Sequence, residues 1–62
     1  MLHDFRINAE LARLESALEK VARLVLLDPV YAPIFLRLEQ EITKVRLTLD
    51  AVDRARALVR NR

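Results

Sequence analysis

Apolar residues recur along the chain at alternating spacings of three and four, and this pattern is interrupted once. Such spacings place side chains on one face of an α-helix, in the a/d pattern of helices that pack side by side. The pattern therefore predicts two long helices, each with one apolar stripe. The stripe positions are Ile7, Leu11, Leu14, Leu18, Val21 and Val25 before the interruption, and Phe35, Leu38, Ile42, Val45, Leu49, Val52 and Val59 after it.

The interruption contains both prolines of the chain, and the sequence has no glycine. Asp28 followed by Pro29 is typical of a helix start. The aspartate side chain accepts hydrogen bonds from the exposed N–H groups at the start of a helix, and proline fits the first turn. Pro33 lacks an N–H group and disfavours the α conformation in the preceding residue, Ala32. We therefore expect a short helical or irregular turn here, with Val30, Tyr31 and Phe35 closing the end of the bundle.

The predicted fold is all-α, a single domain over residues 1–62 that forms an antiparallel helical hairpin. The first helix covers about residues 4–27, with Asp4 favoured as its N-cap. The turn covers residues 28–32, and the second helix covers about residues 33–60.

A hairpin of 62 residues is small, and 53% of its residues are hydrophobic. A chain of this length buries too little surface to be very stable alone, and it usually needs disulfides, a metal or oligomerisation. The sequence has no cysteine and one histidine, so self-association remains. We expect a homodimer that forms a four-helix bundle. The sequence leaves open whether the partner is instead a different chain, and whether the two hairpins pack parallel or antiparallel. The build resembles that of the Rop family of plasmid RNA-binding proteins, which are dimeric four-helix bundles; the resemblance covers no sequence motif and carries over no RNA-contacting residue.

Leucines form a second line on the predicted second helix, at intervals of eleven residues. Eleven residues make about three turns, so these side chains lie in one row nearly opposite the apolar stripe. The segment 24–27 is also too apolar to be solvated on all sides. Scattered surface leucines would be one explanation; contact with a second subunit or a protein partner is the other. The candidate contact residues are Leu24, Leu27, Leu36, Leu47 and Leu58.

Arginines are concentrated near the C-terminus, in a chain with a formal net charge of +2. A nucleic acid could be bound through its phosphates by Arg54, Arg56, Arg60 and Arg62. The alternative is a charged helix end that complements the helix dipole, and it is favoured because Asp50 and Asp53 lie nearby and no aromatic residue interleaves the cluster. Arg56, at a stripe position, either extends its head group to solvent or sets the helix register.

Chemistry-bearing motifs are lacking. Glu15 and Glu19 share a helix edge without a partnering histidine or cysteine, Ser16 has no nearby base, and His3 lies near the chain terminus. We therefore expect no catalytic, cofactor or metal site and no small-molecule substrate. The sequence shows no signal peptide and no membrane span, which predicts a cytoplasmic location without membrane binding.

The expected function is that of a small, non-enzymatic, dimeric module for protein–protein interaction or regulation. The alternative is a small dimeric regulator that binds RNA or DNA through its C-terminal arginines. An enzyme that assembles a site from arginine and glutamate side chains between subunits is the third and least favoured hypothesis.

Overall fold

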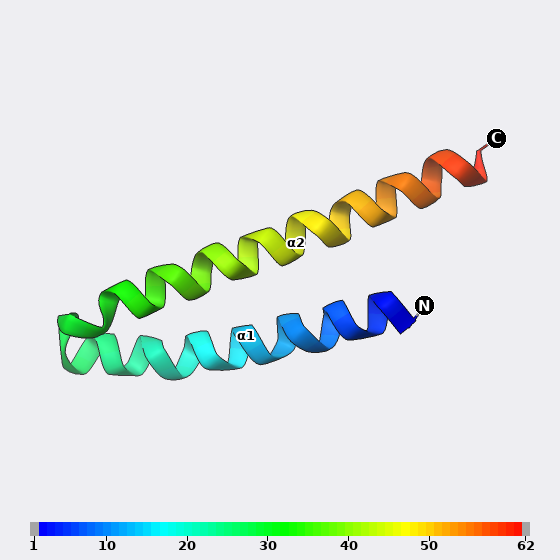
Figure 1. Cartoon of the computed structure of the whole chain (residues 1–62). Helices are drawn as coiled ribbons and strands as arrows, with labels where there is room; N and C mark the ends of the chain where they lie inside the picture. The colour runs from blue at the N-terminus through cyan, green and yellow to red at the C-terminus, as the bar shows by residue number, and fades with distance from the viewer. Residues whose placement is uncertain (1, 62) are drawn as a thin grey trace.

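The computed structural model describes the backbone of residues 2–61 and the side chains of residues 6–61. It contains helix α1 (Leu2–Leu27), the short 3₁₀ turn η1 (Pro29–Tyr31) and helix α2 (Ala32–Arg60). The all-α prediction is confirmed for this part of the chain. The helices run in opposite directions and lie side by side near η1 (Figure 1).

The first helix begins earlier than predicted. It starts at Leu2, so Asp4 lies inside α1 rather than at its N-cap. No glycine or proline occurs before Pro29, so nothing in the backbone forces a later start. The prediction of Asp4 as the N-cap is therefore wrong, and the side chain of Asp4 lies outside the described residues.

The turn uses the residues that the sequence indicates. Asp28 has extended backbone angles, and its Oδ1 accepts a hydrogen bond of 3.0 Å from the backbone N–H of Val30. The backbone N–H of Tyr31 donates to the carbonyl of Asp28 at 3.2 Å, and the N–H of Asp28 donates to the carbonyl of Leu24 at 2.8 Å. Asp28 thus closes α1 and caps η1 at the same time.

The expectation that Pro33 keeps Ala32 out of the α conformation is wrong. Ala32 has φ −56° and ψ −40°, and its N–H donates to the carbonyl of Pro29. This hydrogen bond holds the residue in place against the preference that a following proline imposes. Pro33 itself lies in the first turn of α2, where an N–H group would have no partner within the helix.

The apolar stripes face each other, and together they form what we call the seam. One member is buried and the others are half-buried, and the members are Ile7, Leu11, Leu14, Leu18, Val21, Val25, Phe35, Leu38, Ile42, Val45, Leu49 and Val52. Ile42, 5% exposed, is the only buried residue among the described side chains. The seam of a lone hairpin therefore brings its residues into contact without removing most of them from water.

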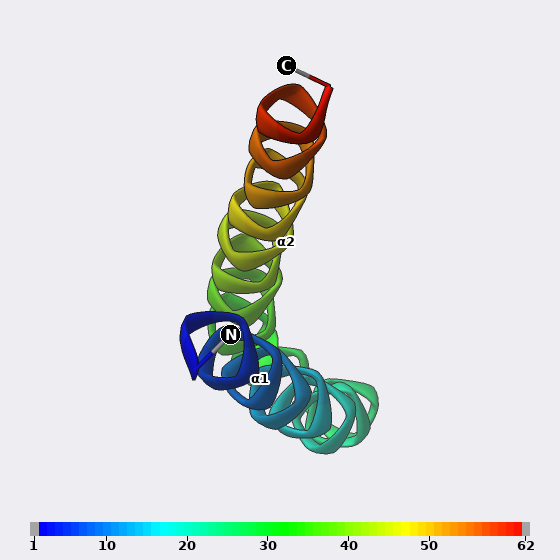
Figure 2. The ribbon, with the colours of Figure 1, turned by 90° about the vertical axis from the view of Figure 1, so that its right-hand side faces the viewer.

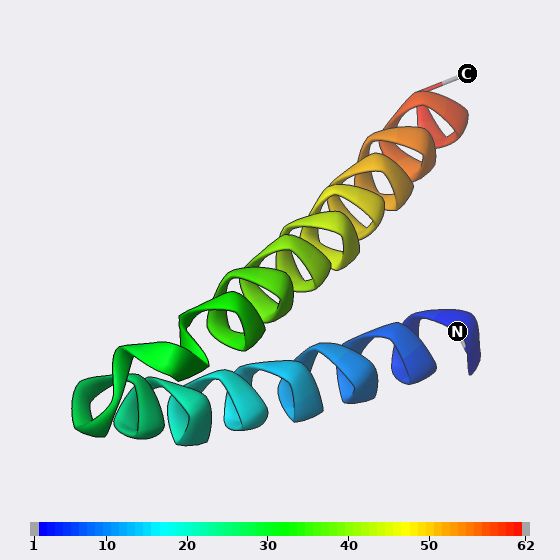
Figure 3. The same cartoon turned by 60° about the vertical axis from the view of Figure 1, so that its left-hand side comes forward.

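Val59 differs from the sequence prediction, because this residue of the α2 stripe is 76% exposed. The helices diverge toward the chain termini, as two views show (Figures 1 and 3). Seen from the free ends, the end of α2 lies well away from the start of α1 (Figure 2). Val30 is also exposed rather than closing the end of the bundle, whereas Phe35 is half-buried.

The hairpin is long and thin, with extents of 53 × 17 × 11 Å and a radius of gyration of 15.2 Å. A compact domain of this length has a radius of gyration of about 11 Å. The accessible surface is 5381 Å², whereas a compact monomer of this mass exposes about 4,100 Å². The chain thus exposes about 1,300 Å² more than a compact monomer of its mass.

Candidate interaction surfaces

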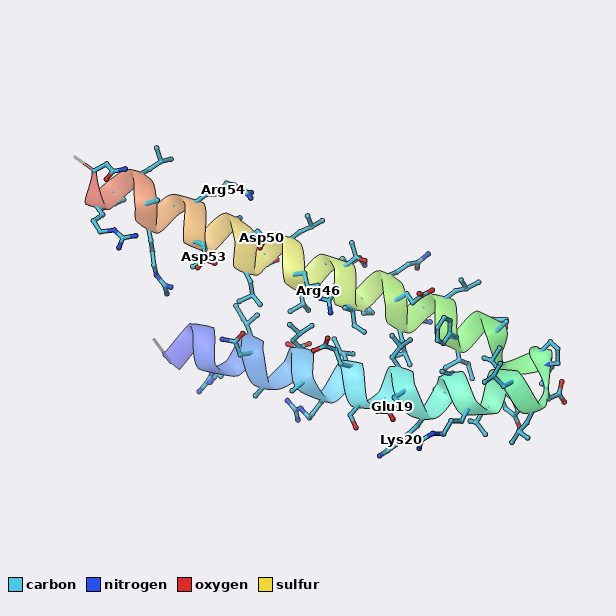
Figure 4. All side chains as sticks on the ribbon, turned by 180° about the vertical axis from the view of Figure 1, so that it is seen from behind. Glu19, Lys20, Arg46, Asp50, Asp53 and Arg54 are labelled. Atoms are coloured by element: carbon cyan, nitrogen blue, oxygen red, sulfur yellow. The ribbon has the colours of Figure 1, made fainter. Side chains whose placement is uncertain are left out.

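An ion pair marks one side of the seam. Seam residues fill positions a and d of a seven-residue pattern, and Glu15 and Arg46 both fill position e, directly after a d residue. Nη2 of Arg46 lies 2.6 Å from Oε2 of Glu15, so the e positions of the two helices meet on this side. Figure 4 shows Arg46 on the side of α2 that faces α1. We call this side the acidic face.

The acidic face carries a groove of about 470 Å³. Its floor is apolar and includes Leu18, Phe35 and Ile42, while Glu19 and Glu39 join the ion pair at the rim. The carboxylates surround an apolar floor rather than converging on a point. Within the described part of the chain, no group of histidine, cysteine, aspartate and glutamate residues could hold a metal ion.

The opposite side of the seam is more apolar. It is bordered by position g of the pattern, the position directly before an a residue. Because the e positions meet at the Glu15–Arg46 pair, the g positions of both helices lie on the other side. Five uncharged residues occupy these positions, and Glu10 and Glu41 occupy the others. We call this side the small-residue face, after Ala17, Leu24, Ile34, Thr48 and Ala55.

The turn end of the molecule is an exposed apolar tip. Between Leu24 and Leu36 the only charged residue is Asp28. Leu26 and Leu27 are 87% and 83% exposed, so they do not pack under the turn. The tip is defined by the exposed apolar residues Leu24, Leu26, Leu27, Val30, Tyr31 and Ile34.

The other end of the hairpin carries a hollow, which we call the free-end hollow. It measures about 600 Å³, and Val52, Ala55 and Val59 form most of its lining, with Arg56 and Arg60 beside them. All five residues belong to α2. The divergence of the helices therefore leaves apolar surface uncovered at the end that lacks the turn.

The predicted leucine line on α2 lies on the surface. Leu36, Leu47 and Leu58 are 56%, 61% and 66% exposed. These side chains are thus available for contact with a partner. Leu24 and Leu27 at the tip are also exposed and available. Whether a partner covers any of them stays a prediction.

The C-terminal arginines within the described residues, Arg54, Arg56 and Arg60, are also exposed. Arg54 points away from α1 (Figure 4). Nη1 of Arg56 lies 3.8 Å from Oδ1 of Asp53, and its side chain is 52% exposed, which fits a head group that reaches solvent. Arg60 lies in the last turn of α2, where its charge complements the helix dipole. Arg62 lies outside the described residues.

Two features of these surfaces escaped the sequence reasoning: the Glu15–Arg46 pair and the small-residue face. The signal for the pair was present, because the two residues lie at nearly equal distances from the middle of the turn. In an antiparallel hairpin, residues equally far from the turn lie at the same level. Because both residues also fill position e, their side chains are predicted to make contact. That contact shows that the g positions of the two helices lie together on the opposite face.

Comparisons with protein-family models, curated proteins and solved structures find no match. Neither helix, over its described residues, is apolar for long enough to cross a bilayer. Function must therefore be inferred from the surfaces of the hairpin.

Proposed function

We propose that this protein is a small, non-enzymatic, cytoplasmic module that forms a homodimer and acts through protein–protein interaction. The observation that carries the proposal is the half-buried seam, in which Ile42 is the only buried residue among the described side chains. A hairpin that exposes its core residues on both sides gains stability when a second surface covers them. Two copies supply that surface to each other.

The surface area supports this proposal. The excess of about 1,300 Å² over a compact monomer exceeds the roughly 800 Å² that each partner contributes to a standard protein interface. The small-residue face is the best candidate for the contact, since alanine side chains let helices approach closely and most of its positions are uncharged. Packing of two hairpins there would produce a four-helix bundle.

The leucine line would then remain on the outside of the dimer and serve a second contact. Leu36, Leu47 and Leu58 lie nearly opposite the seam, so dimerisation through the small-residue face does not cover them. A row of exposed leucines is suited to the apolar groove of a protein partner. This row is the part of the surface through which we expect regulation of another protein.

Light scattering on a size-exclusion column tests the dimer. The wild type should have twice the 7.2 kDa mass of one chain. Leu24→Glu, on the small-residue face, should shift the mass toward the monomer, because dimerisation would bury the new charge. The matched control Leu47→Glu introduces the same charge on the outer face and should leave the mass unchanged. A wild type that elutes as a folded monomer would overturn the proposal.

The alternative function is binding of RNA or DNA, and the exposure of Arg54 and Arg60 at one end of the hairpin favours it. Binding through phosphates would weaken steeply as salt rises. The double change Arg54→Ala with Arg60→Ala should then abolish retention of labelled RNA or DNA in a mobility-shift assay. Lys20→Ala with Arg23→Ala removes the same charge from α1 and is the control. Equal binding by both double variants would reject a site at these arginines.

A further inference from the structure

We infer that the second copy packs antiparallel to the first along the small-residue face, with the apolar tip of each copy covering the free-end hollow of the other. This inference rests on the proposed dimer and adds the direction and the contacts of its partner. Three observations carry it: both ends of the hairpin expose apolar surface, the two ends differ in charge, and each end presents a residue at position g of the seven-residue pattern.

Both ends of the hairpin expose apolar surface. At the turn, the tip exposes Leu27, Val30 and Ile34. At the other end, the open, shallow hollow is lined by Val52, Ala55 and Val59. A parallel dimer would place hollow against hollow and tip against tip. An antiparallel dimer places an apolar tip over each apolar hollow and removes both surfaces from water.

Charge favours the same direction. The end of α2 carries Arg54, Arg56 and Arg60, with Asp50 and Asp53 as the nearby acids, so its local charge is weakly positive. Parallel packing would bring two such clusters together, and like charges in close contact disfavour association. The tip carries only Asp28, which is negative. Antiparallel packing therefore replaces a repulsive contact with a neutral or attractive one.

Both contacts lie on the same face of the hairpin. Ile34 at the tip and Ala55 in the hollow occupy position g of the seven-residue pattern, which borders the small-residue face. Along α2, Ile34 lies two residues after the first residue and Ala55 lies five residues before the last, a difference of less than one helical turn. A two-fold axis across the middle of α2 therefore brings Ile34 of one copy near Ala55 of the other, and the reverse.

Spin labels can test the direction, since the sequence has no cysteine to compete with an introduced one. A nitroxide attached to Leu26→Cys, which is exposed near the turn and is not among the residues named for the contact, reports the distance between the two tips. A helix of 29 residues is about 43 Å long, so an antiparallel dimer should give a tip-to-tip distance above roughly 35 Å. A distance below about 20 Å in a protein with dimeric mass would overturn the direction and leave the dimer standing. A monomeric mass would overturn the proposed dimer itself.

A compensating pair of changes tests the contact. Ala55→Glu should raise the dissociation constant of the dimer at least about tenfold, because the tip would bury the carboxylate without a partner. Ile34→Lys in the same chain should recover most of that loss, since antiparallel packing places the lysine beside the glutamate of the other copy. Ala9→Glu is the control for charge on the outer face of α1. If Ile34→Lys weakened the affinity of the Ala55→Glu dimer further, the result would contradict a contact between Ile34 and Ala55 of the two copies.

Discussion

Arg46 donates a hydrogen bond of 2.6 Å to Glu15 across the hairpin, and the two residues lie 31 positions apart in the sequence. This ion pair joins α1 to α2, whereas the pairs Glu19–Arg23, Glu41–Lys44 and Asp53–Arg56 each lie within one helix. It identifies which flanks of the two helices meet. It therefore separates the acidic face from the small-residue face.

The Glu15–Arg46 pair should contribute little to stability despite its short distance. The side chains of Arg46 and Glu15 are 59% and 46% exposed, and exposed pairs contribute about 0.2–1 kcal/mol. A double-mutant cycle with Glu15→Ala and Arg46→Ala, measured by urea unfolding at one protein concentration, should give a coupling energy in that range. High salt should reduce it. A coupling energy several times larger would show that water is excluded from the pair.

Ile42→Ala should be among the most damaging single substitutions in α2. The residue is 5% exposed, and removing a buried isoleucine side chain costs about 2–5 kcal/mol. Far-UV circular dichroism during urea unfolding measures the loss. Leu47→Ala, a change of similar size at an exposed site on the same helix, should alter the unfolding free energy by less than about 0.5 kcal/mol. Similar losses for both variants would contradict the assigned burial.

Asp28→Ala should destabilise the turn. It removes the acceptor of the Val30 N–H hydrogen bond, and the loss of an N-cap side chain costs about 0.5–2 kcal/mol. Asp28→Asn keeps an acceptor at the same place and should retain most of the stability. Thermal unfolding of both variants at equal concentration distinguishes capping from charge, because only the alanine variant should lose several degrees.

The thermal midpoint of the wild type should rise with protein concentration. If two hairpins stabilise each other, dilution favours the unfolded chain by mass action. Calorimetry or circular dichroism over a hundredfold range of concentration measures this shift. A monomer that folds alone would give the same midpoint throughout, which makes the experiment independent of any substitution.

The sequence alone determined the helices and the place where they break. The three-and-four spacing of the apolar residues and the Asp28-Pro29 pair act locally, through helix periodicity and N–H capping, and the structure keeps both. A local rule also gave a wrong prediction, because Ala32 takes the α conformation that a following proline, Pro33, disfavours. A hydrogen bond to Pro29 outweighs that preference, and local propensities do not include it.

Only the tertiary structure decided which stripe residues are covered and which flanks meet. Val52 and Val59 follow the same pattern, yet Val59 is exposed, because the helices diverge near their free ends. Burial depends on the path of both helices in space, and periodicity reports only which residues share a face. The Glu15–Arg46 pair likewise depends on the level at which the turn aligns the helices. The tip and the free-end hollow follow from that alignment, since they lie where the packing of α1 against α2 ends.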